Sequence, residues 1–188
     1  MKNRLLFLLK FCLFVPIQIP VFFFVLKPYL VALSAVAVFA ISHIAGYEPE
    51  TAECVRKNTP ISFLAPYNLQ YTYQTRTFGI NGTRVTINLV SYYALVLATA
   101  GVAMRHRLAR AARGTFVLVC LHLILVATAI VAGISFDGYV LQQIESLLFV
   151  LGISSTFLLW AFEFGKELGL DEFFQQHEHK EPKETTSQ

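Results

Sequence analysis

The sequence predicts a mainly α, polytopic membrane protein, in which a bundle of about four transmembrane helices carries a small extracytoplasmic β-hairpin. Four stretches, residues 5–26, 87–104, 114–134 and 140–162, are apolar almost throughout. Each comes close to or exceeds the roughly 20 helical residues that are needed to cross a bilayer. Charged residues make up 14% of the chain, whereas soluble domains carry about 25%. The apolar stretches and the low charge together place the chain in a membrane.

The N-terminal region, residues 1–46, is expected to hold the first membrane helix. Its basic start resembles a signal peptide, but the apolar stretch that follows is too long for a typical h-region and contains Pro16 and Pro20. We therefore expect a retained helix, kinked at the prolines. Residues 29–46 are also apolar, and we expect them at the outer interface or packed on the bundle. A second crossing and a single long, bent helix are the alternatives.

The orientation follows from four arginines between Met104 and Arg113, which we expect to form a short loop. Short loops rich in Lys and Arg remain in the cytoplasm. This puts both termini and the polar tail, residues 163–188, on the cytoplasmic side of a bacterial inner or plasma membrane. Residues 47–86 lie on its external side. Residues 87–162 then form a region of three membrane helices. Arginines at helix ends reach lipid headgroups, so membrane lipids are expected partners and nucleic acid is not.

The external segment contains a pattern of strands. Residues 69–77 alternate in type along the chain, as a half-exposed strand does. Asn81-Gly82 favours a hairpin turn because both residues tolerate positive φ, and residues 83–87 are the expected return strand. The sequence thus predicts a β-hairpin on the outer surface, close to the start of the second membrane helix.

An exposed aromatic and basic set on this hairpin is the predicted contact surface for a membrane protein partner. The set consists of Tyr71, Tyr73, Arg76 and Arg84; aromatic residues and arginine dominate the energetics of many interfaces. The alternative is that the tyrosines cover the protein's own apolar surface. A homo-oligomer is a further open alternative.

Two ionisable residues fall inside apolar stretches and are candidates for function. Glu145 lies near the outer end of the last helix and His122 in the third, and ionisable groups in a membrane are costly. A small transporter or channel subunit would use them, whereas the plainer expectation is a hydrogen bond to a neighbouring helix. His122 has no second ligand three or four residues away, so neither a metal site nor a cofactor is expected.

The order of features over residues 5–134 resembles a family of small membrane proteins associated with exosortase H. The resemblance rests on Asn88 and Tyr92, which match an N-x-x-x-Y start of the second helix, and on the basic turn that follows. Leu89 stands where the family usually has proline. The resemblance implies a non-enzymatic accessory role in bacterial envelope protein sorting, which is our main expectation.

The alternative is a membrane cysteine peptidase or transpeptidase that uses Cys54. Glu53-Cys54 is similar to the catalytic cysteine segment of exosortases, although Val55 and Arg56 replace the small residue and glycine expected there. A catalytic thiolate needs a nearby base or cation that lowers its pKa. Arg56, among others, is close enough in sequence to supply the charge.

Overall fold

The computed structural model describes residues 2–56, 67–99 and 101–165. The elements in chain order are α1 (Lys2–Ala45), β1 (Thr51–Arg56), β2 (Tyr67–Tyr73), β3 (Arg76–Ile80), α2 (Gly82–Thr86), α3 (Asn88–Ala98), α4 (Met104–Ser135) and α5 (Gly138–Phe164). The mainly helical class is confirmed. Among the described helices, α1, α4 and α5 are long and apolar enough to cross a membrane, and the expected count of four spans is not confirmed. The expected tail, from residue 166 onward, lies outside the described residues.

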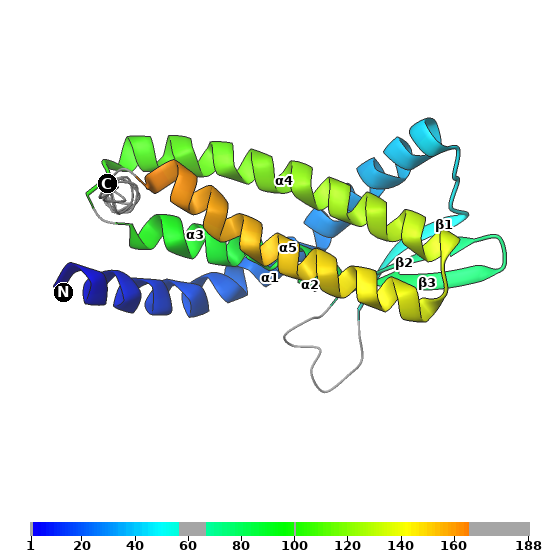
Figure 1. Cartoon of the computed structure of the whole chain (residues 1–188), viewed down its shortest axis with the longest axis horizontal. Helices are drawn as coiled ribbons and strands as arrows, with labels where there is room; N and C mark the ends of the chain where they lie inside the picture. The colour runs from blue at the N-terminus through cyan, green and yellow to red at the C-terminus, as the bar shows by residue number, and fades with distance from the viewer. Residues whose placement is uncertain (1, 57–66, 100, 166–188) are drawn as a thin grey trace, which may run out of the picture.

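The N-terminal region forms one continuous helix. The two apolar stretches that we expected as separate pieces join in α1, which contains Pro16, Pro20 and Pro28. Proline removes one backbone hydrogen bond and bends a helix without necessarily ending it. Figure 1 accordingly shows the last part of α1 running in a different direction from its first part. The alternative of a single long, bent helix describes the region best.

The expected second membrane helix is wrong in its length. α3 ends at Ala98, where the Thr99 hydroxyl donates to the Leu95 carbonyl over 2.8 Å, and Gly101 follows with φ +84°. The predicted arginine loop is wrong as well, because Met104 already begins α4. Alanine, leucine and arginine are strong helix formers, so the Arg-Ala repeats extend the third helix instead of forming a loop.

The β element is a three-stranded antiparallel sheet in the order β1-β2-β3. The hairpin turn lies at Gln74, which has φ 54°, and not at Asn81-Gly82. Asn81 instead caps α2, its side chain accepting a hydrogen bond from the Arg84 backbone N–H at 3.2 Å. Residues 83–86 are therefore helical, and the predicted return strand there is wrong. Asparagine favours both hairpin turns and helix N-caps, so the local sequence does not separate them.

The sheet packs beside the helix bundle at one end. Figure 1 shows α4 and α5 side by side, with the sheet near the turn that joins them. The first turns of α1 and the last turns of α5 meet at the opposite end, where the rings of Phe7 and Trp160 stack 5.5 Å apart. One core cluster joins Leu30 of α1, Leu69 and Tyr71 of β2, and Ile130 of α4. The arginines of α4 and the sheet thus occupy opposite ends of the molecule.

Candidate functional site

A series of buried hydrogen bonds joins the three long apolar helices, α1, α4 and α5, with α3. The Tyr29 hydroxyl of α1 lies 2.7 Å from Nδ1 of His122 in α4, and His122 Nε2 lies 2.7 Å from Oδ1 of Asn88 in α3. Asn88 Nδ2 then donates to the carbonyl of Gly152 in α5 over 3.1 Å. His122 and Asn88 are both buried. The series therefore binds four helices together in the bundle core.

The partners of His122 fix its tautomer. Because Asn88 Nδ2 donates to Gly152, Asn88 presents Oδ1 to the imidazole as an acceptor. Nε2 must then carry the ring proton and donate it, and Nδ1 accepts from the Tyr29 hydroxyl. Each donor in this series of hydrogen bonds therefore points in the direction from α1 toward α5. This fully paired arrangement offsets the cost of burying a polar ring.

Sequence reasoning found His122 but not the two residues that hold it. Tyr29 had no distinguishing pattern around it, and Asn88 was noted only as the first residue of the N-x-x-x-Y motif. In the structure, both residues of that motif point into the bundle. Tyr92, one turn after Asn88, is buried, and its hydroxyl donates to the Arg110 carbonyl over 3.3 Å. Asn88 and Tyr92 thus bind α3 to its neighbouring helices at two successive turns.

Glu145 is held separately from His122. One of its carboxylate oxygens accepts a hydrogen bond from the Asn81 backbone N–H at 3.3 Å, beside the start of α2. α2 and α5 are in contact there, near the sheet. The structure therefore does not bring the two predicted intramembrane residues into direct contact; each has its own set of partners.

The predicted contact set does not form one exposed surface. Tyr71 is fully buried and its hydroxyl lies 2.8 Å from that of Ser34 in α1, so its expected exposure is wrong. Burial raises the pKa of Tyr71 to about 12, against the opposing effect of the Ser34 hydrogen bond. Tyr73 is half-buried and pairs across the hairpin with Arg76, which is exposed. Arg84 is exposed on α2. Tyr71 is buried because it covers the apolar surface of α1 and α4, which was the alternative expectation for the tyrosines.

The outward face of the sheet is polar. Strand register places Thr51 and Thr72 opposite each other, then Glu53 and Gln70, then Val55 and Asn68, while Thr77 continues the face on β3. Glu53, Gln70 and Thr77 are exposed. The prediction of one strand over residues 69–77 is wrong at Gln74, where a turn divides it and moves Thr77 onto the face of Gln70.

Cys54 lies on the inward face of β1, opposite Leu69 of β2. The residue is half-buried and packs against the core cluster. Burial raises the pKa of its thiol, and the charge of Lys27 opposes this only in part. A thiol with a raised pKa is a poor nucleophile at neutral pH, so this environment does not favour the peptidase alternative.

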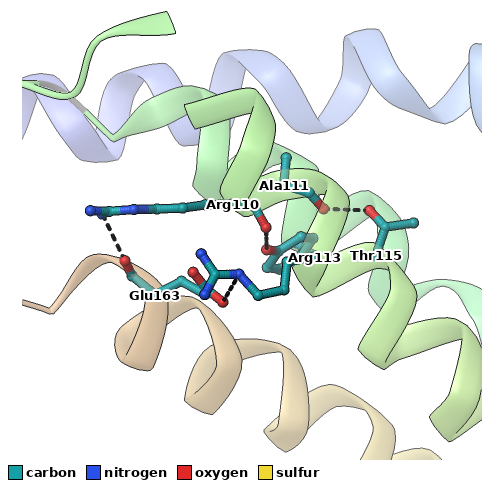
Figure 2. Close-up of polar contacts among 6 residues, drawn as sticks. Arg110, Ala111, Arg113, Thr115 and Glu163 are labelled. Atoms are coloured by element: carbon teal, nitrogen blue, oxygen red, sulfur yellow. Dashed lines mark hydrogen bonds and ion pairs between the residues drawn. The ribbon is translucent and has the colours of Figure 1, made fainter. Parts of the chain in front are cut away.

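At the opposite end, two arginines of α4 converge on Glu163 of α5, which sequence reasoning missed (Figure 2). Arg113 Nε lies 3.4 Å from the Glu163 carboxylate, and Arg110 Nη1 donates to the Glu163 carbonyl over 2.8 Å. The Glu163 side chain is only 6% exposed. The Arg110 guanidinium also lies 5.3 Å from the centre of the Phe164 ring. The sequence signal that could have revealed this contact is the acidic Glu163 directly after an apolar stretch.

Within the described residues, no group of three or more His, Cys, Asp or Glu side chains lies close enough together to hold a metal ion. Comparison of the chain with family models, with curated proteins and with solved structures found no match. The function must therefore be argued from the arrangement of the chain itself.

Proposed function

We propose that this protein is a non-enzymatic accessory protein of a membrane complex, which contacts its partner through the outward face of the sheet. The observation that carries the proposal is the division of the sheet into two faces. One face packs on α1 and α4 through Tyr71 and Ile80, and the other presents Glu53, Gln70 and Thr77 to the surroundings.

The inward face gives the sheet a fixed position. The bond between Tyr71 and Ser34 ties β2 to α1. On β3, the ring of Phe78 lies directly against Gly133 of α4, at a place where a Cβ atom would meet it. A hairpin alone is marginal in water, so this packing supplies much of its stability. A rigid polar face gives a partner hydrogen-bonding groups at defined positions, which limits the entropy lost on binding.

Site-specific photocrosslinking tests this proposal. A benzoylphenylalanine residue is placed at Gln70 or at Thr77 in the full chain, and at Tyr139 as a control. Tyr139 is 71% exposed and follows the turn between α4 and α5, at the same end of the molecule. We expect the two sheet positions to yield the same crosslinked membrane protein and the control to yield none. Crosslinks from Tyr139 alone, or from none of the three, would contradict the proposal.

The orientation of the protein in the membrane and the cellular process that it serves are also part of the proposal. We place both termini in the cytoplasm of a bacterial cell and the sheet outside, from the arginines of α4 and the positive-inside rule. A role in envelope protein sorting rests only on the resemblance to the exosortase-associated family. A crosslinked partner that belongs to another process would remove that part while leaving the sheet as the contact surface.

The transporter alternative has less support from the geometry. The bonds of His122 connect neighbouring helices, from α1 through α4 and α3 to α5. Such a pattern strengthens the packing of helices, whereas a proton or ion path needs groups that follow one another along the membrane normal. Glu145 is engaged elsewhere, with Asn81.

A further inference from the structure

An apolar groove of about 490 Å³ runs between α1, α3 and α4. Small-molecule sites commonly have volumes of roughly 300–1,000 Å³. Its walls include Ile17, Val21 and Val25 of α1, Val90 and Leu97 of α3, and Val119 of α4. Val21 is 65% exposed and Ile17 is 56% exposed, so the groove opens sideways out of the bundle. A side opening between membrane helices faces the lipid.

The size of the groove suits a hydrocarbon chain. It follows α1 from Ile17 to Tyr29, which is about 18 Å of helix. One leaflet of the hydrocarbon core is about 15 Å thick. A single extended acyl chain can therefore follow the groove along most of its length.

Two cations flank the end of the groove that is nearest the arginines. Lys10 is half-buried and lies two turns before Ile17 on the same face of α1. Arg107 of α4 donates from Nη1 to the carbonyl of Leu97 over 3.4 Å and from Nη2 to that of Val102 over 3.2 Å. Leu97 is itself part of the groove wall. Positive charge therefore lies at the end where a lipid headgroup would sit.

No acidic residue opposes this charge on the helices that form the groove. The sequence contains no Asp or Glu before Glu48, and none between Glu53 and Asp137. α1 and α4 consequently carry lysine and arginine as their only charged side chains, apart from histidine, and α3 carries none. Anionic headgroups are attracted to such clusters.

We propose that this groove binds one acyl chain of an anionic glycerophospholipid, with the phosphate beside Lys10 and Arg107. The other end of the groove is bounded by Tyr29, whose hydroxyl already donates to His122. Of the groups that line the groove, Tyr93 and Thr115 are also paired, their hydroxyl oxygens lying 2.6 Å apart. Gln18, with its amide turned to suit its neighbours, donates to the Val90 carbonyl over 3.1 Å and accepts from the Ala94 N–H at 3.3 Å. The bound chain thus needs to offer no hydrogen bonds, as a hydrocarbon cannot.

Native mass spectrometry of the purified full chain, supplied with phosphatidylglycerol or phosphatidylcholine, tests the proposal. We expect one phosphatidylglycerol to remain bound per chain, with about fivefold preference over phosphatidylcholine for each headgroup cation. The Val21→Trp variant fills the groove and should lose the lipid. Val31→Trp, at an exposed position of α1 outside the groove, should keep it.

The charge is tested separately. Lys10→Gln should lower the preference for phosphatidylglycerol about fivefold, and Lys27→Gln, an exposed lysine of the same helix, should not. If Val21→Trp fails to fold, Lys10→Gln carries the test, because it alters a side chain without filling the groove. Equal binding of both lipids by the unmodified protein, or undiminished binding by Val21→Trp, would overturn the proposal. So would a dimer that Val21→Trp dissociates, since a second copy would then occupy the groove.

Discussion

The Tyr29 hydroxyl donates a hydrogen bond to Nδ1 of His122, 2.7 Å away, although 93 residues separate the two in sequence. The same imidazole donates through Nε2 to Asn88. Both nitrogens of a buried ring are thereby paired, and the proton has one allowed position. A membrane histidine that we expected to make one interhelical bond makes two, and the bundle core depends on both.

Replacement of Tyr29 by phenylalanine should destabilise the protein. Tyr29→Phe removes the donor and leaves His122 Nδ1 buried without a partner, which costs about 1–3 kcal/mol. Tyr139→Phe removes the hydroxyl of an exposed tyrosine and should have almost no effect. Unfolding of the purified proteins in detergent, followed by circular dichroism, gives the two values. Equal stability of both variants would show that the hydrogen bond contributes nothing.

A methyl group at Gly133 should loosen the sheet from the bundle. A Cβ atom there would meet the ring of Phe78, whereas one at Gly138 would meet no atom within 4 Å. Overpacking of this kind costs about 1–3 kcal/mol. Gly133→Ala should therefore lower the unfolding temperature and expose β3 to protease, and Gly138→Ala should do neither. Protection of β3 in Gly133→Ala equal to that of the unmodified protein would contradict the packing of Phe78 on α4.

The sequence predicted the elements whose signal is local and missed those that depend on contacts between elements. Three long apolar helices follow from composition alone. The end of α3 depends on Thr99 and on Arg107, which binds carbonyls across the loop, and neither contact has a sequence pattern. Asn81 was placed in a turn because its cap role requires knowing that residues 82–86 are helical.

The residues of the candidate site also divide into those that the sequence identifies and those that it does not. His122 was identifiable because a titratable residue in an apolar stretch is rare. Tyr29 was not identifiable, since one tyrosine in an aromatic-rich helix carries no mark of its partner. The turn at Gln74 decides the faces of the residues after it: Arg76 falls on the face of Tyr73, and Thr77 falls on the opposite face.

Loss of the charge on Glu163 should weaken the contact between α4 and α5 modestly. Glu163→Gln removes the ion pair with Arg113, whose side chain is 65% exposed, but keeps the backbone carbonyl that Arg110 binds. Exposed pairs contribute about 0–1 kcal/mol, and because the Glu163 side chain is only 6% exposed, we expect a loss near the top of that range at low salt. Glu53→Gln, on the outward face of the sheet, is the control. The difference between the variants should shrink at high salt because salt screens exposed charges; a difference that persists would assign another role to Glu163.

Labelling of Cys54 with a membrane-impermeant maleimide tests the orientation and the burial of the thiol together. In intact cells we expect labelling that Cys54→Ser abolishes, because β1 lies outside in the proposed orientation. Maleimide reacts with the thiolate, and burial raises the pKa of Cys54, so the rate at neutral pH should be low. Below that pKa the rate should rise roughly tenfold per pH unit.

An exposed thiol in the same sheet is the matched control for this experiment. The chain Cys54→Ser, Gln70→Cys places the cysteine on the polar face, where Gln70 is exposed, and should label faster at neutral pH. Equal rates for the two chains at every pH would mean that Cys54 is not shielded. Labelling of both chains only after the membrane is permeabilised would reverse the orientation, because it would put the sheet in the cytoplasm and the arginines of α4 outside. The lipid groove would then lie in the outer leaflet, with Lys10 and Arg107 at the external surface.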